Sequence, residues 1–288
     1  MLDGRAADLR QASDVDPVAT FAPNLFAGRT ALVTGSGRGI GKAVALAFAR
    51  LGADVTIAGR NADTLAAAAE EIRTHGRQCL AVPMSIREVE QVDALVNQAI
   101  DRFGAIDFLV NNAGGQFPAR PSAISDRGWR AVVDLNLNGT WNMCSRVGPR
   151  MLARGFGAIV NIVHIYSFER GAPSFVHSGA ARAGVVSMTR SLAYYWGRHG
   201  VTINALAPGT VSTQGVREAE FKPLEQQDYE RIAVADIPCH RLAEPEEVAA
   251  MCVFLCSPAA RYINGASIIA DGAYYLGNWT PGFDPEVP

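Results

Sequence analysis

Seven residues, Gly35 to Gly41, read Gly-Ser-Gly-Arg-Gly-Ile-Gly and separate a short apolar run from an alanine-rich one. Glycine permits sharp turns and lets backbone N–H groups approach a ligand closely. A helix that begins near Gly39 would point the positive end of its dipole into the same space. A loop of this kind between a buried strand and a helix predicts a site for the pyrophosphate of a dinucleotide. We assign its contacts to Gly35, Ser36, Arg38, Gly39, Ile40 and Gly41.

The end of the next strand bears on which dinucleotide is bound. An acidic residue at this place would bind the ribose 2′-hydroxyl of NAD and repel a 2′-phosphate. Gly59 occupies the place, and Arg60 follows it. Together with Arg38 of the glycine loop, Arg60 offers guanidinium groups, which suit a phosphate dianion. The sequence therefore favours NADPH/NADP+ over NADH/NAD+; the alternative is that Arg60 is only a solvated residue at a strand end.

These residues lie in a regular alternation of short apolar runs and longer helical segments. The predicted strands are Thr30–Thr34, Asp54–Ala58, Cys79–Pro83, Asp107–Val110, Ala158–Val163, Thr202–Leu206 and Ser267–Ala270. The predicted helices are Ile40–Leu51, Ala62–His75, Glu88–Phe103, about Asp126–Ala153, Ala180–Arg198 and Pro245–Leu255. Continuous apolar strands that alternate with helices predict an α/β fold, a single-domain Rossmann doubly wound parallel sheet. Its ligand crevice would lie at the carboxyl ends of the strands.

The same alternation sets the expected limits of the domain. Residues 1–25 are polar and are predicted to be a flexible arm, 26–275 the dinucleotide-binding catalytic domain, and 276–288 a tail. The long connection at about 212–240 is predicted to be a substrate lid. Its basic residues would either meet the phosphates of an acyl-CoA or form a solvated face with their acidic neighbours; they are Arg217, Lys222 and Arg231.

Composition excludes several classes of protein. Of the 288 residues, 49% are hydrophobic and 19% charged, and the net charge is −2, which is typical of a globular protein with neither a nucleic-acid surface nor a polybasic membrane anchor. No apolar run is long enough to cross a bilayer, and the first residues lack the pattern of a secretory signal. The five cysteines form no CxxC pair and the histidines no metal-ligand spacing. We expect free thiols, a cytoplasmic protein and no metal.

Further motifs follow the glycine loop in order. Asn-Asn-Ala-Gly begins at Asn111, Asn136 lies in the long helix, and Pro-Gly-Thr-Val-Ser-Thr begins at Pro208. With these motifs the chain resembles the short-chain dehydrogenase/reductase family from about Gly28 to Gly272. The resemblance implies further cofactor contacts from Ser85, Ile86, Asn112, Ala113, Gly114, Arg182, Pro208, Gly209, Val211 and Thr213. Ser85 stands where the family usually has an aspartate beside the adenine.

The catalytic positions depart from the family pattern. That pattern has a serine after the fifth strand and then Tyr-x-x-x-Lys at the start of the next helix. When the segments are matched on Ala183-Gly184-Val185, His164 takes the place of the serine, Ser178 that of the tyrosine and Arg182 that of the lysine. We expect Ser178 to be a helix N-cap or a polar pocket residue. The usual set of catalytic residues is therefore absent.

One subgroup of the family shares this departure. The 2,4-dienoyl-CoA reductases and peroxisomal trans-2-enoyl-CoA reductases lack the usual tyrosine, and dienoyl reductases carry one a few residues after the fifth strand instead. Tyr166, five residues after Asn161, lies where that tyrosine would be. The stretches Val176–Val185 and Gly114–Phe117 are closely similar to the peroxisomal enoyl reductase. The chain thus resembles this subgroup more specifically than the family at large.

The residue types suggest the chemistry. Hydride transfer to an electrophilic carbon leaves negative charge on an oxygen, which needs a hydrogen bond or a proton. Tyr166 is the first candidate donor, and His164 either a second donor or a residue that lines the pocket. Arg182 would supply a permanent positive charge, and Asn136 would orient a water or the substrate oxygen.

The residues predict an NADP(H)-dependent oxidoreductase, and the resemblance implies that it reduces a C=C bond conjugated to a thioester, as in an enoyl-CoA or dienoyl-CoA. Two alternatives stay open. One is a carbonyl reductase or alcohol dehydrogenase that acts on a small hydrophobic ketone or alcohol, since a fold hosts many activities. The other is a dinucleotide-binding protein without catalysis. The resemblance further implies a homo-oligomer, commonly a tetramer.

Overall fold

A parallel sheet of seven strands forms the centre of the protein. The computed structural model describes residues 16–215, 234 and 236–277. Within this part of the chain the strand order is β3-β2-β1-β4-β5-β6-β7, and all neighbouring strands run parallel. The strands are β1 (Thr30–Thr34), β2 (Asp54–Gly59), β3 (Cys79–Pro83), β4 (Phe108–Asn111), β5 (Gly157–Ile162), β6 (Val201–Pro208) and β7 (Ser267–Ala270).

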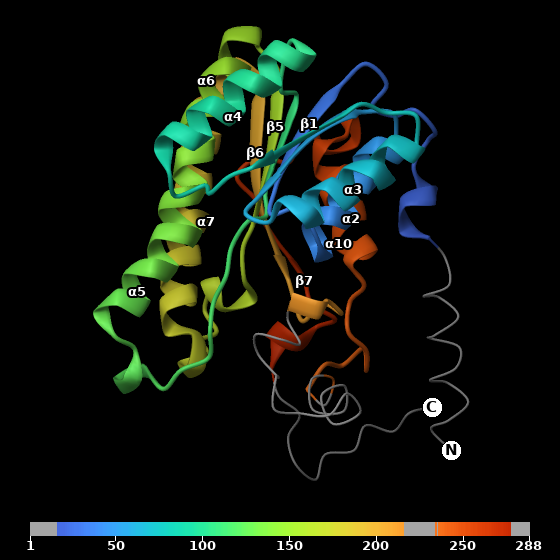
Figure 1. Ribbon diagram of the computed structural model, residues 1–288. Helices are drawn as coiled ribbons and strands as arrows, with labels where there is room; N and C mark the ends of the chain where they lie inside the picture. The colour runs from blue at the N-terminus through green and yellow to red at the C-terminus, as the bar shows by residue number, and fades with distance from the viewer. Residues whose placement is uncertain (1–15, 216–233, 235, 278–288) are drawn as a thin grey trace, which may run out of the picture.

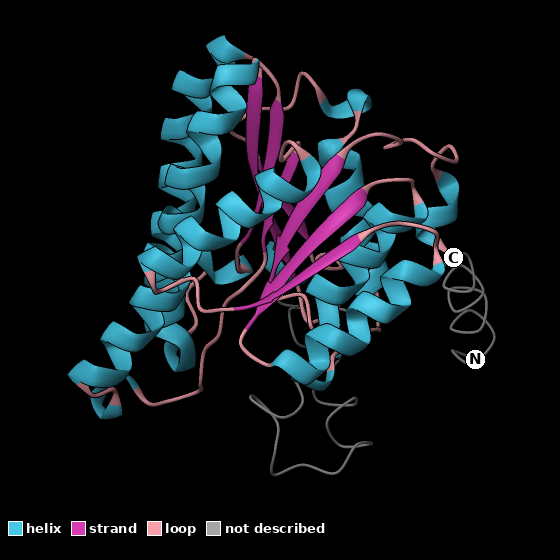
Figure 2. Cartoon of the chain, turned by 45° about the horizontal axis from the view of Figure 1, so that its top comes forward, coloured by secondary structure: helices cyan, strands magenta, loops and turns pink. Residues whose placement is uncertain are grey.

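Helices cover both faces of the sheet, as Figure 1 shows. One layer holds α2 (Gly39–Arg50), α3 (Ala62–Thr74) and α10 (Pro245–Cys256), and the other holds α4 (Val89–Phe103), α6 (Gly139–Arg154) and α7 (Val176–Trp196). The sheet twists between the two layers (Figure 2). This arrangement confirms the predicted doubly wound α/β fold.

Successive apolar side chains along each strand point to opposite faces of the sheet, so helices must cover both faces. Leu32, Leu109 and Ile159 pack against the layer of α4, α6 and α7. Their neighbours Val33 and Val110 pack against the layer of α2 and α10 instead. Every residue of β1, β4 and β5 is buried. A strand with apolar side chains on both faces is stable only where helices exclude water from both sides.

The long helix predicted at about Asp126–Ala153 is interrupted by a turn of different helix type. It consists of α5 (Asp126–Val133), one π-helical turn η4 (Asp134–Asn138) and α6. A π turn inserts one extra residue into a helix and changes the direction of the side chains around it. Periodicity does not reveal such a turn, because apolar positions on either side still fit a helix.

The helix predicted from Ala180 begins earlier, at Val176, after the short 3₁₀ turn η6 (Pro173–Phe175). Ser178 is therefore inside the first turn and is not the N-cap, which is Phe175. The Ser178 hydroxyl is buried without a hydrogen-bond partner in the described structure. The prediction of Ser178 as a helix N-cap was wrong, because the run of small residues before Ala180 is compatible with a helical turn. The other short turns are η2 (Pro17–Thr20), η3 (Pro121–Ala123), η5 (Ile165–Ser167), η7 (Gly197–His199), η8 (Pro258–Ala260) and η9 (Tyr274–Leu276).

The second part of the predicted arm packs onto the domain. Val18 is 2% exposed and belongs to the core on the α2 side, and Asp16 pairs with Arg50 of α2. The hydrogen bond to Arg50 is the main reason why the pKa of Asp16 lies below its usual value. Residues 1–15, most of the predicted lid with Arg217, Lys222 and Arg231, and residues 278–288 of the predicted tail lie outside the described residues.

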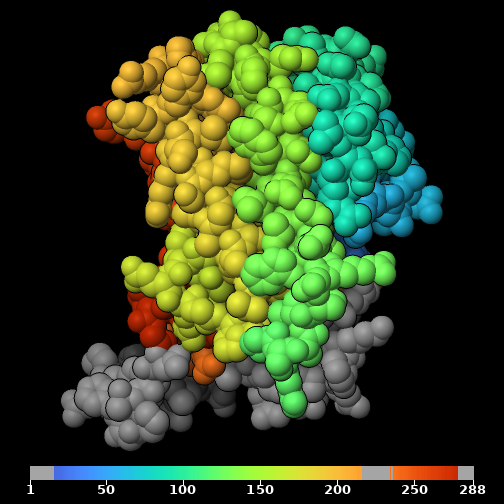
Figure 3. Space-filling model, turned by 90° about the vertical axis from the view of Figure 1, so that its left-hand side faces the viewer, coloured from blue at the N-terminus to red at the C-terminus, as the bar shows by residue number. Residues whose placement is uncertain are grey.

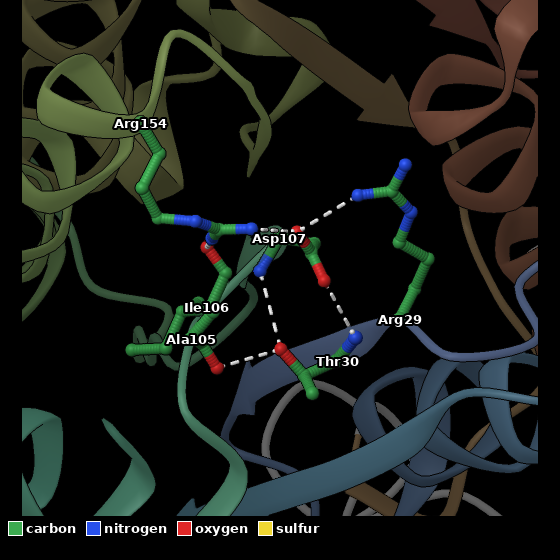
Figure 4. Close-up of polar contacts among 6 residues, drawn as sticks. All are labelled: Arg29, Thr30, Ala105, Ile106, Asp107 and Arg154. Carbon is green, nitrogen blue, oxygen red and sulfur yellow. Dashed lines mark hydrogen bonds and ion pairs between the residues drawn. The ribbon is translucent and has the colours of Figure 1, made fainter.

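Asp107 anchors the amino end of the sheet (Figure 4). This carboxylate is 2% exposed and accepts hydrogen bonds from the backbone N–H of Thr30 at 3.0 Å and from Nη2 of Arg154 at 2.7 Å. Arg29 adds a third contact at 3.4 Å. Because the backbone N–H groups at the start of a strand need partners, this carboxylate joins β1, β4 and the end of α6.

We expect Asp107→Ala to lower the free energy of unfolding by about 2–4 kcal/mol, since it leaves a buried N–H and two arginines without their acceptor. Urea unfolding followed by circular dichroism measures this change. The control is Asp93→Ala, which breaks the surface pair with Arg146 and should cost less than about 1 kcal/mol. Equal losses in the two variants would show that Asp107 is not an anchor.

Candidate active site

The glycine loop after β1 and the Asn-Asn-Ala-Gly loop after β4 are bonded directly to each other. Nδ2 of Asn112 donates to the carbonyl oxygens of Thr34 and Gly35, both at 3.0 Å. Oγ1 of Thr34 accepts from the backbone N–H groups of Asn112 at 3.1 Å and Ala113 at 3.0 Å. A Cβ atom on Gly35 would lie 2.8 Å from Cα of Ala113, and Gly35 has a φ of +66°. Only glycine permits this approach, as the sequence predicts.

The glycine loop leads into α2 with an open helix N-terminus. Arg38 is the N-cap residue of α2 and makes no side-chain capping hydrogen bond. The first N–H groups of a helix have no partners inside the helix, so Gly39, Ile40 and Gly41 present donors to an anion. Ser36 is buried, and its hydroxyl donates to Val33 O and accepts from Ala58 N, which ties the loop to β2. The loop therefore fits a pyrophosphate.

The residues assigned to the adenosine half lie at the ends of β2 and β3. Arg60 is exposed and directly follows β2. The neighbouring strand β1, whose Thr34 pairs with Ala58 of β2, leads into the loop that carries Arg38. Ser85 follows β3, and its backbone N–H donates to Oε1 of Gln91 at 2.8 Å. Ile86 is 5% exposed, and its carbonyl accepts from Asn142 of α6. The carboxyl edge of the sheet thus carries these candidates on adjacent strands.

The segment from Pro208 to Thr213 returns to the glycine loop. Gly209 passes so close to β7 that a Cβ would lie 2.8 Å from Cα of Asp271. Val211 is 2% exposed and forms a β-bridge with Ala243. A Cβ on Gly39 would lie 3.4 Å from Cγ2 of Thr213. The structure thus brings the Pro208–Thr213 segment to the loop after β1.

Arg182 of α7 extends to the ends of β4 and β5. Its Nη1 donates to the carbonyl oxygen of Ile162, the last residue of β5. Its Nη2 occupies the space that a side chain on Gly114 would fill. Burial lowers the pKa of Arg182 to about 10, so the guanidinium stays charged at neutral pH. The arginine thus places a permanent cation between two strand ends, where the sequence alignment puts it.

Asn136 lies in the π turn and binds backbone atoms. Its Nδ2 donates to the carbonyl oxygens of Gly115 and Val132, both at 2.8 Å, and its Oδ1 accepts from Gly115 N at 3.2 Å. The side chain is 1% exposed. These contacts hold the loop after β4 against α5 and the π turn. Asn136 therefore fixes the position of Gly114 and Gly115.

His164 and Tyr166 lie together at the start of η5, directly after β5. The Nδ1 atom of His164 accepts from the backbone N–H of Tyr166 at 3.3 Å, and the His164 N–H faces Oγ of Ser167 at 3.3 Å. The two rings are 4.3 Å apart between centroids. Nε2 of His164 is 3.4 Å from the side-chain nitrogen position of Gln116. Burial, and secondarily the charge of Arg182, lowers the pKa of His164 to about 3.

Aromatic side chains flank this pair. The ring of Phe175 stacks parallel to Tyr166 at 6.4 Å, and His177 meets the ring of Phe117 edge-on at 4.5 Å. His177 is fully buried, and burial lowers its pKa. The structure therefore gathers Tyr166, His164 and Arg182 around the loop at Gly114. It also brings in Gln116 and Phe175, which the sequence did not single out as site residues.

The segment after β7 holds the loop that carries Tyr166. The backbone N–H of Glu169 donates to the hydroxyl of Tyr275 at 3.0 Å. The guanidinium of Arg170 lies 4.2 Å from the centre of the Tyr274 ring and donates to the carbonyl of that residue. Asp271 accepts from the backbone N–H of Tyr275 at 2.6 Å and so fixes the turn. We name these contacts the C-terminal clasp.

A buried polar chain below the site was also missed by the sequence analysis. Nδ2 of Asn111 donates to Oδ1 of Asn161 at 2.8 Å, and Nδ2 of Asn161 donates to Oγ1 of Thr189 at 2.9 Å. All three side chains are at most 3% exposed. These hydrogen bonds link β4, β5 and α7. The available signal was an asparagine inside an otherwise apolar strand, where an unbonded amide would be costly.

Several kinds of site are missing from the described part of the chain. It holds no group of three histidine, cysteine or acidic side chains placed to bind a metal. The five cysteines are free thiols. Among the described helices, none has the length and apolarity needed to span a membrane.

Gly114 and Gly115 offer a matched test of the site. We expect Gly114→Ala to displace the Arg182 guanidinium, and to press on Oδ1 of Asn136, which would lie 2.7 Å from the new Cβ. Nicotinamide dinucleotide binding should weaken by about 10-fold or more. Circular dichroism checks that the variant is folded. Gly115→Ala should change binding by less than about 3-fold, because its Cβ would meet only Cδ2 of Leu135 at 3.4 Å. Calorimetric titration measures both. Similar affinities in the two variants would disprove the role of Gly114.

Comparisons with known proteins agree with this geometry. The family model described as "Enoyl-(Acyl carrier protein) reductase" matches residues 35–274. A probable 2,4-dienoyl-CoA reductase of Bacillus subtilis is 37% identical, over 86% of this chain and 97% of the relative.

Two solved structures superpose on most of the chain. A putative short-chain alcohol dehydrogenase from Sinorhizobium meliloti has a TM-score of 0.82 at 34% identity, covering 88% of this chain and 98% of its own. An actinorhodin polyketide ketoreductase variant with NADPH has a TM-score of 0.82 at 30% identity, covering 89% and 100%. The chain is therefore an oxidoreductase that belongs to the short-chain dehydrogenase/reductase family, whose fold binds a nicotinamide dinucleotide.

Proposed function

We propose that this enzyme uses NADPH to reduce a C=C bond conjugated to a thioester carbonyl, as in an enoyl-CoA or a dienoyl-CoA. The observation that carries the proposal is the cluster of Tyr166, His164 and Arg182 at the ends of β4 and β5, together with the absence of Tyr-x-x-x-Lys at the start of α7. The similarity to a relative described as a 2,4-dienoyl-CoA reductase supports the same substrate class.

Arg60 and Arg38 support the choice of NADPH. They follow β2 and β1, which are adjacent in the sheet, and no acidic residue ends β2. Two guanidinium groups near the adenosine ribose would stabilise the dianion of a 2′-phosphate. The ketoreductase with a similar fold was solved with NADPH, which is compatible with this choice.

The residues of the cluster have separate tasks in the proposed reaction. The bound cofactor supplies the hydride. As the carbon β to the thioester carbonyl gains it, the electron pair of the C=C bond moves onto the carbonyl oxygen and forms an enolate. Tyr166 donates the proton that completes the reduction at carbon. Arg182 stabilises the negative charge near the end of β5, while Asn136 keeps Gly114 and Gly115 in place.

A ketone is the second candidate substrate. Two similar structures are described as an alcohol dehydrogenase and a ketoreductase. A phenol near the end of β5 could equally protonate the oxygen of a reduced ketone. The two reactions differ in the atom that finally carries the proton, and the residues of the site serve either.

We also propose that the enzyme is a homo-oligomer in a reducing cytoplasm. Figure 3 shows α6 and α7 side by side on one face. Trp141 of α6 is 46% exposed, and Tyr195 of α7 is 63% exposed. Large exposed aromatic side chains on a helix face favour burial in an interface. The free thiols of all five cysteines suit a reducing compartment.

A substrate panel tests the proposed reaction. The purified protein is incubated with NADPH and, in turn, a trans-2-enoyl thioester, a 2,4-dienoyl thioester and a small hydrophobic ketone, while absorbance at the nicotinamide band is followed. Turnover of either thioester without the ketone supports the proposal. Turnover of the ketone alone would replace it with the second candidate. Tight NADPH binding with no turnover of any substrate would favour a binding protein.

Tyr166→Phe tests the proton donor. Loss of the phenolic hydroxyl should lower kcat by about 10²–10⁴-fold and leave the Kd for NADPH within about 2-fold, since general acid catalysis is worth about this much. Tyr194→Phe is the control, because Tyr194 is 77% exposed on α7. Steady-state kinetics and calorimetry provide the two readouts. An unchanged kcat in Tyr166→Phe would remove this residue from the mechanism.

Arg60→Ala tests the cofactor preference. We expect the Kd for NADPH to rise about 10- to 100-fold, the effect of losing a charge-assisted hydrogen bond, with little change for NADH. Arg198→Ala removes an exposed arginine at the far end of α7 and should affect neither cofactor. A preference for NADPH that survives Arg60→Ala would assign the selectivity elsewhere.

A further inference from the structure

The backbone of η5 fixes the ring of His164. Its Nδ1 accepts the Tyr166 N–H, and the hydroxyl of Ser167 faces the His164 N–H in return, which is a reciprocal capping arrangement. An imidazole nitrogen that accepts a hydrogen bond uses its only lone pair in the ring plane, so it cannot also carry a proton. The neutral imidazole must therefore carry its proton on Nε2. The short turn determines the tautomer without a carboxylate partner.

The protonated edge of the ring points toward the site. Nε2 lies 3.4 Å from the Gln116 side-chain amide, on the loop that follows Gly114. With the proton on Nε2, the amide is oriented with its oxygen toward the ring and accepts a long hydrogen bond of 3.4 Å, and a bound substrate oxygen would replace it as the acceptor. The ring face lies against Tyr166 at 4.3 Å. A substrate whose carbon takes a proton from Tyr166 would therefore bring its carbonyl oxygen beside the Nε2–H of His164.

The surroundings of the ring disfavour a second proton. Arg182 of α7 is the charged group beside it, and Tyr166 is the other titratable group in contact. The described hydrogen bonds and ring contacts of His164 include no carboxylate. Burial and the Arg182 charge both act against the imidazolium, so the pKa of about 3 keeps the ring neutral throughout the physiological range.

We propose that His164 is a neutral hydrogen-bond donor, whose Nε2–H binds the substrate oxygen on which negative charge develops, while Tyr166 alone transfers the proton. This assignment rests on the proposed reduction and goes beyond it, because it gives His164 a fixed electrostatic role. A neutral donor keeps its proton during the reaction and needs no reprotonation. His164 therefore donates a hydrogen bond to the oxyanion but transfers no proton, and Tyr166 supplies the one proton that the reduction needs.

Two substitutions of His164 distinguish a neutral hydrogen-bond donor from a proton-transferring acid and from a residue that only lines the pocket. His164→Gln keeps an N–H near the position of Nε2 but cannot titrate, and we expect kcat to stay within about 10-fold of the native value. His164→Phe keeps an aromatic ring without a donor, and kcat should fall by about 10²-fold or more with KM little changed. His75→Phe replaces an exposed histidine at the end of α3 and is the control. The Kd for NADPH, measured on each variant, reports whether the site is folded.

A spectroscopic test needs no turnover. With ¹⁵N-labelled histidine, the His164 ring signals are assigned by their loss in His164→Gln, and long-range ¹H–¹⁵N correlation gives the tautomer. We expect a proton on Nε2 and no titration between pH 5 and pH 8. A His164 pKa inside that range, a proton on Nδ1, or full kcat in His164→Phe would each overturn the assignment. Failure of the native protein to reduce any thioester would overturn the proposed function, and the ring spectrum would still decide the state of His164.

Discussion

The close approach of two backbone segments at the carboxyl edge of the sheet sets the geometry on which the rest of the site depends. The loops after β1 and β4 come so near that Gly35 meets Ala113 with no room for a side chain, and Thr34 and Asn112 bond them together. The strands β2 and β3 are added on one side of β1, and β4 to β7 on the other side. The chain after β1 and the chain after β4 therefore lead into helices on opposite faces of the sheet, and a crevice is left between them. The residues proposed to bind the cofactor and substrate lie around that crevice. The double layer of helices and the anchor at Asp107 hold the strands in the register that this approach requires.

The fold was predictable because its signals are local and repeated. Buried strands such as Ala-Leu-Val in β1 have apolar side chains for both faces, and glycine punctuates the turn that follows. Residue order therefore predicts the sheet, and the structure differs mainly at element ends. The π turn at Asp134–Asn138 was not predictable, because an extra residue in a helix leaves the apolar stripe nearly in phase. The start of α7 at Val176 was missed because histidine, serine and glycine there give no strong helical signal.

The candidate site was predictable in its residue types and less so in its contacts. Alignment places Arg182 and Tyr166 near each other, but only the structure reveals that the guanidinium reaches the carbonyl of Ile162. The capping contact that fixes the His164 ring depends on a single turn of backbone. The pairing of His164 with Gln116 joins segments 48 residues apart in the chain, a relation that no spacing rule contains. Tertiary contacts of this kind determine protonation state, so the chemistry of a histidine cannot be derived from its place in a motif alone.

The C-terminal clasp connects the chain beyond the last strand to the loop that carries Tyr166. Tyr275 contacts Glu169, and Arg170 contacts Tyr274, and neither contact involves the loops after β1 and β4. Substitutions of Tyr274 or Tyr275 can therefore alter the conformation of the β5–α7 loop, whereas Asp271 also packs against Gly209 of the Pro208–Thr213 segment. In evolutionary terms, these two tyrosines can vary separately from the loops after β1 and β4. Descendants of one ancestor could acquire new substrates through changes at Tyr274 and Tyr275 and retain the same nucleotide.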